Sequence, residues 1–237
     1  MTSTSLIPTP IWFTLTGFGG VAVTIPAALA VAAWLAAGMR LRAAAEWLGA
    51  LGLAGGLTVL TKVAFLGWGV GIRPIDFTGI SGHAVLSTLV YPVIFGVVLI
   101  NTPIAFRRAG FLAGLTFGFA IGASRVALHA HSVSEIIAGC VLGAFIACLF
   151  ISRLEKMPAP TEPTPHPLLV SLSLAIIIGS LHGMHVPTQR WVTSIALDLS
   201  GHERPFIRAR WHRDGRVKAT PKFVDNLTAV HTHRPAS

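Results

Sequence analysis

The chain has 237 residues, of which 53% are hydrophobic and 11% are charged, and its mean hydropathy is +0.70. A soluble domain of this length carries about 25% charged residues, so this sequence has too little charge to cover a water-facing surface. These figures exclude an ordinary soluble enzyme or binding domain. They predict an all-α, polytopic bundle in which lipid replaces water as the solvent.

Six apolar stretches follow one another along the chain, and each is expected to be a transmembrane helix. They cover residues 17–38, 47–68, 84–100, 109–123, 136–152 and 167–184. Several are shorter than the roughly 20 residues that a spanning helix needs, so flanking polar residues are expected to extend them. No Lys or Arg precedes the first stretch. It therefore lacks the basic region of a cleaved signal peptide, and we expect it to stay in the mature protein.

The composition divides the chain into two parts. Residues 1–184 are predicted to form the membrane-embedded domain, and residues 185–237 a polar tail that holds nine of the 18 Lys and Arg residues. Residues 208–216 of this tail are expected to be solvated and to lie on anionic lipid headgroups. No recognition motif accompanies the charge, so nucleic acid is not an expected partner.

Small residues follow a helical period in the fourth and fifth stretches. This spacing allows two helix backbones to approach closely in lipid, so we expect these stretches to pack as neighbours and to bring their ends together. The residues are Gly110, Gly114, Gly118, Gly122, Gly139 and Gly143. Cys140 and Cys148 lie in one apolar run without metal or redox spacing, and are expected to be small buried hydrophobic residues.

Basic residues in the short connections predict the orientation of the helices. They follow the first, third and fifth stretches, which places them on one side of the membrane, the side expected to be cytoplasmic. The residues are Arg40, Arg42, Arg107, Arg108, Arg153 and Lys156.

A second group of polar residues falls at the opposite ends of the helices. Charged residues in or near spanning segments are costly and are functional candidates by default. In an alternating topology three cations and two histidines of this group share one face, which is typical of a site for a multiply charged anion. The group consists of Lys62, Arg73, His83, Arg125, His131 and Glu135.

These residues occur in strings that resemble the signature motifs of the type 2 phosphatidic acid phosphatase and vanadium haloperoxidase superfamily. The strings are KVAFLGWGVGIRP from Lys62, SGH from Ser81 and SRVALHAHSVSE from Ser124. The resemblance covers roughly residues 44–152. Ten residues separate Lys62 from Arg73 where the family has six, Ile80 stands where the family has Pro, and Glu135 stands where it has Asp.

The resemblance implies a phosphatase that needs no metal or other cofactor. His131 would attack phosphorus to form a phosphohistidine, Glu135 would orient its ring, and His83 would protonate the leaving group. The phosphate oxygens would be bound by side chains and by backbone N–H groups at a helix start. These phosphate-binding candidates are Lys62, Arg73, Ser81, Gly82, Ser124 and Arg125.

Each of these residues also has a simpler interpretation. Glu135 could close a helix-capping box with Ser132, which is compatible with the catalytic role. Lys62 could extend its ammonium group to the membrane surface without binding a ligand, and Arg73 and Arg125 could be interface anchors. His83 could be an ordinary polar residue at a helix start.

Two other functions remain open on the sequence alone. The string from Gly79 to Gly82 resembles the Gly-x-Ser-Gly of rhomboid intramembrane proteases, in which Ser81 would be the nucleophile and His131 its base. A non-enzymatic anion transporter would also use intramembrane charges. Neither alternative accounts for three cations at these spacings from two histidines.

We therefore expect a bacterial cytoplasmic-membrane enzyme with its active site on the outer face. Its expected substrate is a lipid phosphate, either phosphatidic acid-like or a polyprenyl diphosphate such as undecaprenyl diphosphate. Transfer of the phosphate to another lipid is compatible with the same residues.

Overall fold

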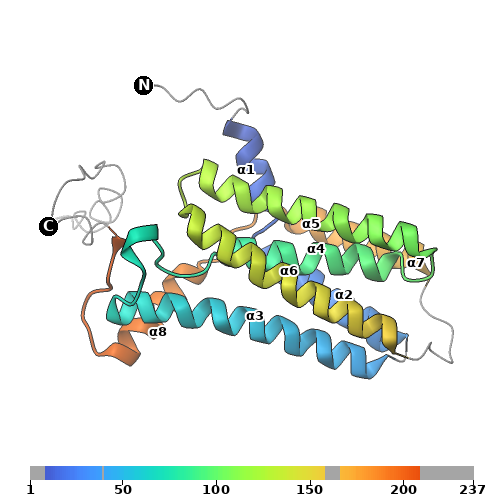
Figure 1. Cartoon of the computed structure of the whole chain (residues 1–237), viewed down its shortest axis with the longest axis horizontal. Coiled ribbons are helices and arrows are strands. Elements are labelled where there is room, and N and C mark those ends of the chain that lie inside the picture. The colour runs from blue at the N-terminus through green and yellow to red at the C-terminus, as the bar shows by residue number, and fades with distance from the viewer. Residues whose placement is uncertain (1–8, 39, 158–165, 209–237) are drawn as a thin grey trace, which may run out of the picture.

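The computed structural model describes residues 9–38, 40–157 and 166–208, and all regular structure in these ranges is helical apart from one isolated β-bridge. Most of the helices run back and forth along the long axis of the molecule, whereas the helix nearest the N-terminus stands away from it (Figure 1). Their bounds are α1 Thr9–Gly17, α2 Val21–Ala37, α3 Leu41–Trp68, the 3-10 turn η1 Arg73–Ile75, α4 Gly82–Val98, α5 Ile104–Ala127, α6 Val133–Lys156, α7 Pro167–Leu181 and α8 Thr188–Ser200.

Four segments within the described ranges are long and apolar enough to cross a membrane: Thr9–Ala37, Leu41–Trp68, Ile104–Ala127 and Val133–Lys156. The all-α fold expected from the sequence is therefore confirmed, and these four segments are candidate membrane spans, whereas the expected number of six stays a prediction. Helices α4 and α7 are apolar but shorter, with 17 and 15 residues. The first apolar segment begins earlier than expected, since α1 precedes it and is joined to α2 through Phe18–Gly20.

Helix α4 is the centre of the bundle, because the glycines of both α5 and α6 pack against it. A Cβ at Gly114 would lie 2.6 Å from Pro92, and one at Gly118 would lie 2.9 Å from the Ser87 backbone. On α6, Gly139 approaches Ser81 with the same closeness. Gly122 lies against Cys140 and Ile136 of α6, so α5 and α6 do meet near their connection as expected, whereas Gly114, Gly118, Gly139 and Gly143 pack against α4.

The two ends of the bundle differ in chemistry. At one end, Arg107 of α5 pairs with Glu155 of α6, and Arg153 lies 3.9 Å from Glu46 of α3. The connections α2–α3 and α4–α5 lie at this end (Figure 1). The predicted basic loops therefore do share one end. The α3–α4 and α5–α6 connections, which hold the candidate site, lie at the other.

The first part of the predicted polar tail is a helix that packs on the bundle. Val192 and Ala196 of α8 are buried against Val63, Phe65 and Leu66 of α3. Helix α8 therefore runs beside the end of α3 that leads to the candidate site (Figure 1). Of residues 208–216, which the sequence predicts to be solvated, only Arg208 lies within the described residues.

Candidate active site

His131 and Glu135 form a hydrogen-bonded pair where α5 turns into α6. Nδ1 of His131 lies 2.7 Å from Oε2 of Glu135, and the Glu135 side chain is only 1% exposed. A buried carboxylate that accepts from Nδ1–H fixes the ring and leaves Nε2 unprotonated in the neutral tautomer. The pair therefore presents one defined nucleophilic nitrogen.

The capping box at the start of α6 coexists with this pair. Ser132 accepts from the Glu135 backbone N–H, and the Ser132 N–H donates to Oε2 of Glu135 at 3.2 Å. The capping interpretation of Glu135 is therefore confirmed and coexists with its contact to His131, while its catalytic role stays a prediction. The cap also fixes the carboxylate relative to the helix axis, which adds rigidity to the bond with His131.

The second carboxylate oxygen of Glu135 accepts from residues that the sequence motifs did not identify. The Thr78 N–H donates to Oε1 at 2.8 Å, the Thr78 hydroxyl donates to the same atom, and Arg208 donates to it at 2.6 Å. Thr78 lies in the α3–α4 connection and Arg208 follows α8. No sequence pattern joins either of them to Glu135, since they are 57 and 73 residues away.

Lys62 and Arg125 surround His131 with positive charge. Burial lowers the pKa of His131, the charges of Lys62 and Arg125 lower it further, and the hydrogen bond that His131 donates to Glu135 opposes them. The field at His83 also arises from Arg125, His131 and Lys62. The four groups are Lys62 of α3, His83 of α4, Arg125 of α5 and His131 before α6. They therefore lie within electrostatic range of one another.

Arg125 is held from the first helix. Its Nη1 donates to the Thr16 hydroxyl at 2.9 Å, while its Nε is buried and has no hydrogen-bond partner among the described residues. A buried guanidinium N–H without a partner is costly, and an anionic oxygen would satisfy it. Thr16 was not identified from the sequence, because it lies 109 residues from Arg125.

The break between α1 and α2 lies beside His83. A Cβ at Gly19 would lie 3.2 Å from Cδ2 of His83 and would clash with Ile121, so the close approach requires glycine. Tyr91 holds the break by donating to the Phe18 carbonyl at 2.7 Å. His83 is the second residue of α4, and its ring lies next to the break between α1 and α2.

The ten residues between Lys62 and Arg73 comprise the end of α3 and a short segment that leads into a small loop. Ile72 and Phe77 pair as an antiparallel bridge, with N–H donations of 2.9 and 3.1 Å, and Arg73 lies exposed between them in η1. Gly79, at φ +143°, then brings the chain back against the Lys62 backbone. Lys62 thus reaches the site. The role of Arg73 as a phosphate ligand stays a prediction.

Three smaller phosphate-binding predictions concern the start of α4 and the end of α5. The Ser81 N–H donates to the Glu135 carbonyl at 3.3 Å, and Gly82 opens α4 as expected. The Ser124 hydroxyl is buried and donates to the Ile121 carbonyl of its own helix at 2.6 Å. The roles of Ser81, Gly82 and Ser124 as phosphate ligands stay predictions.

The Ser81 hydroxyl bears on the protease alternative. It is buried and has no hydrogen-bond partner in the described part of the chain, and it is not bonded to a histidine. A serine nucleophile is normally activated by a hydrogen-bonded base. The ring of His131 is directed to Glu135 instead, so the geometry favours histidine as the nucleophile.

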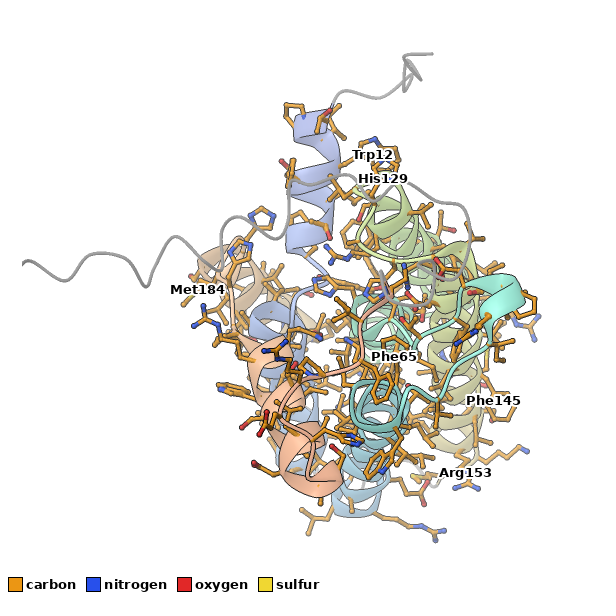
Figure 2. The ribbon with its side chains drawn as sticks, turned by 90° about the vertical axis from the view of Figure 1, so that its left-hand side faces the viewer. Trp12, Phe65, His129, Phe145, Arg153 and Met184 are labelled. Carbon is orange, nitrogen blue, oxygen red and sulfur yellow. The ribbon has the colours of Figure 1, made fainter. Side chains whose placement is uncertain are left out.

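His129 breaks the spacing of the motif, so no role in the site is expected for it. It adopts a left-handed backbone conformation at φ +53° in the α5–α6 turn. Figure 2 shows it on the same edge of the molecule as Trp12 of α1. Its neighbouring position makes it a suitable control for His131.

The two cysteines differ in environment. Cys140 is buried as expected, whereas Cys148 is exposed, which corrects the expectation for that residue. Cys140 also lines an apolar groove of about 610 Å³ between α5 and α6, together with Val126, Ala127, Val133 and Ile136. This groove follows the same helix ends that carry Arg125 and Glu135.

Comparison with known proteins gives one informative relationship. No family model matches the chain, and no solved structure matches it. The chain is 33% identical over 205 residues to a protein described as "Uncharacterized 22.5 kDa protein in cps region" from Klebsiella pneumoniae. The matched region covers 85% of this chain and 98% of that protein.

Proposed function

This chain belongs to the same family as the Klebsiella pneumoniae protein, and we propose that it is a membrane phosphatase that hydrolyses a lipid phosphate or diphosphate through a phosphohistidine. The observation that carries the proposal is the His131–Glu135 pair within range of Lys62 and Arg125. A half-buried, oriented imidazole beside two cations is suited to attack on a phosphorus atom that already carries negative charge.

The reaction would proceed in two displacements. Nε2 of His131 attacks phosphorus, the bond from phosphorus to the lipid oxygen breaks, and His83 gives its proton to that oxygen. Water then attacks the phosphohistidine, His83 takes a proton from the water, and the N–P bond breaks to release phosphate. Arg125 and Lys62 bind the non-bridging oxygens in both steps, and Arg73 would join them from its loop.

The surroundings of the site support a lipid as the substrate. The apolar groove between α5 and α6 opens beside the helix ends that carry the polar cluster, and is large enough for part of an acyl or prenyl chain. A chain in that groove would leave its phosphate near the α5–α6 turn. This arrangement fits phosphatidic acid-like lipids and polyprenyl diphosphates alike.

The proposal includes six membrane crossings with the site on the outer face. Helices α4 and α7 would be the fifth and sixth crossings, in addition to the four longer segments. Helix α4 can be shorter because its neighbours shield it from lipid on most sides. The basic end, with Arg107 and Arg153, would then be cytoplasmic. In bacteria this places the polar cluster at the external surface of the cytoplasmic membrane.

The test is phosphate release by purified protein from a panel of lipid mono- and diphosphates, with and without EDTA. Wild type should release phosphate equally in both conditions and should form an acid-labile phosphoenzyme. His131→Asn should lower turnover by about 10⁵-fold or more and abolish the phosphoenzyme. His129→Asn is the matched control, since Asn tolerates its left-handed backbone, and should retain activity. Phosphate release by His131→Asn at the wild-type rate would refute the proposal.

A further inference from the structure

The segment after α8 is fixed to the end of α3 at three points. Nδ1 of His202 lies 2.7 Å from the Gly67 carbonyl, and the Phe206 N–H donates to the Leu66 carbonyl at 2.8 Å. The Phe206 ring also covers Gly69, where a Cβ would lie 2.8 Å from the ring. Residues 201–208, named here the C-terminal strap, therefore have a defined path from α8 to the polar cluster.

Arg208, at the end of the C-terminal strap, bridges two carboxylates. Its Nη2 donates to Oε1 of Glu135 at 2.6 Å and to the Thr78 hydroxyl at 3.1 Å, and its Nε lies 3.2 Å from Oδ1 of Asp76. Asp76 is the left-handed residue that ends η1. One planar guanidinium thus connects the C-terminal strap, the α3–α4 loop and α6.

These contacts matter because Glu135 is almost completely buried. A buried carboxylate is stable in one orientation only when its oxygens are all hydrogen-bonded and its charge is balanced. Arg208 and Thr78 occupy Oε1, which directs Oε2 to His131. A guanidinium is suited to this task, because its fixed fork of N–H groups can reach two acceptors at once.

We propose that Arg208 is a positioning residue of the active site, which acts through Glu135 on the orientation and basicity of His131. The inference rests on the proposed function for its effect on catalysis, but its effect on His131 is independent of the reaction. The C-terminal strap is then a part of the active site. The sequence instead predicts that residues 185–237 are a polar tail and that Arg208 belongs to a segment on lipid headgroups.

The direction in which Arg208→Gln should change the protonation of His131 follows from the charges around that ring. Glu135 faces it from α6, Lys62 from α3, Arg125 from α5 and His83 from α4. Loss of the Arg208 charge leaves the Glu135 carboxylate less neutralised, so the protonated form of His131 becomes more favourable. The acid limb of activity should therefore move to higher pH in Arg208→Gln.

The experiment compares Arg208→Gln and Arg208→Lys with Arg204→Gln, an exposed arginine of the same segment. Arg208→Gln should lower kcat by about tenfold or more with little change in KM, because Arg208 does not contact substrate. Arg208→Lys should keep the acid limb near that of wild type while kcat falls, since it restores charge without the fork. Arg204→Gln should match wild type.

A second readout does not depend on activity. Diethyl pyrocarbonate modifies neutral imidazole, so its rate at His131, followed by peptide mass spectrometry across the titration range of histidine, reports the pKa of that ring. Arg208→Gln should raise this pKa. Phe206→Ala, which loosens the C-terminal strap from Gly69, should shift it in the same direction by less.

The outcomes separate the two proposals. If wild type releases no phosphate but Arg208→Gln still shifts the His131 titration, the positioning role stands and the proposed reaction fails. If Arg208→Gln lowers only thermal stability, with an unchanged titration at His131 and unchanged kcat, the positioning role is refuted. A shift of equal size in Arg204→Gln would also refute it, because general surface charge would then be the cause.

Discussion

Nδ1 of His131 lies 2.7 Å from Oε2 of Glu135, and this contact decides which ring nitrogen can react. Because Nδ1–H is directed to the carboxylate, Nε2 carries the lone pair in the neutral ring. The same carboxylate stabilises the positive charge that develops on the imidazole when its other nitrogen bonds to phosphorus. The first two predictions follow from this pair.

Glu135→Gln should lower kcat by about 10³-fold or more, because an amide can hold the ring in the wrong tautomer and cannot balance its charge. Glu135→Asp should give an intermediate kcat, since the shorter side chain cannot reach His131 and Thr78 together. Turnover with a saturating lipid phosphate measures both. Glu155→Gln, at the opposite end of the bundle, is the control, and an equal loss there would contradict the prediction.

The pH dependence of kcat/KM should reflect the lowered pKa of His131. Burial and the nearby cations favour the neutral ring, so the nucleophile stays active below the usual histidine pKa of about 6.5, and the acid limb should lie at lower pH than that value. Since the hydrogen bond to Glu135 raises the pKa of His131, Glu135→Gln should move the limb lower still. A limb above the usual histidine value in wild type would contradict this.

Arg125 is expected to contribute through its guanidinium geometry as well as its charge. Arg125→Lys leaves a positive charge but removes the buried Nε–H that has no hydrogen-bond partner among the described residues. We expect kcat/KM to fall by about 10²-fold. Arg108→Lys, exposed at the other end of the molecule, should have no effect. Equal activity of wild type and Arg125→Lys would show that charge alone suffices.

The close packing of α5 on α4 should make Gly118 intolerant of a methyl group. Gly118→Ala places a Cβ 2.9 Å from the Ser87 backbone, so the helices must separate, at a cost of about 1–3 kcal/mol. Gly52→Ala is the matched control, because its Cβ would have no neighbour within 4 Å, and alanine favours the helix by about 0.5–1 kcal/mol. Thermal unfolding in detergent should therefore separate the two variants, with Gly118→Ala below wild type and Gly52→Ala at or above it.

The proposed orientation can be tested with cysteines introduced one at a time into a Cys148→Ser background, in which the buried Cys140 remains. Ile75→Cys, in the exposed loop of η1, should react with a membrane-impermeant maleimide in intact cells. Phe106→Cys, at the basic end, should react only after the membrane is opened. The reverse pattern would place the polar cluster in the cytoplasm and would contradict the proposed external site.

The sequence by itself predicted the apolar helices α2 to α7 and the residues of the central pair, but it predicted neither α1 nor α8. Apolar runs separated by charge can only be helices in lipid, because each backbone polar group must be satisfied within its own segment. His131 and Glu135 are four residues apart, so their contact is a local property of one turn and helix start. Lys62, Arg125 and His83 could be assigned to one end because connected helices alternate in direction.

Only the tertiary structure decided which further residues join the polar cluster at that end of the bundle. Thr16, Thr78 and Arg208 reach Arg125 and Glu135 from distant parts of the chain, and these contacts depend on the packing of α1, the α3–α4 connection and the segment after α8, not on any local period. The same reason explains why both glycine stripes meet α4. A stripe of small residues shows that a close approach occurs, but the partner is selected by the three-dimensional arrangement of all the helices.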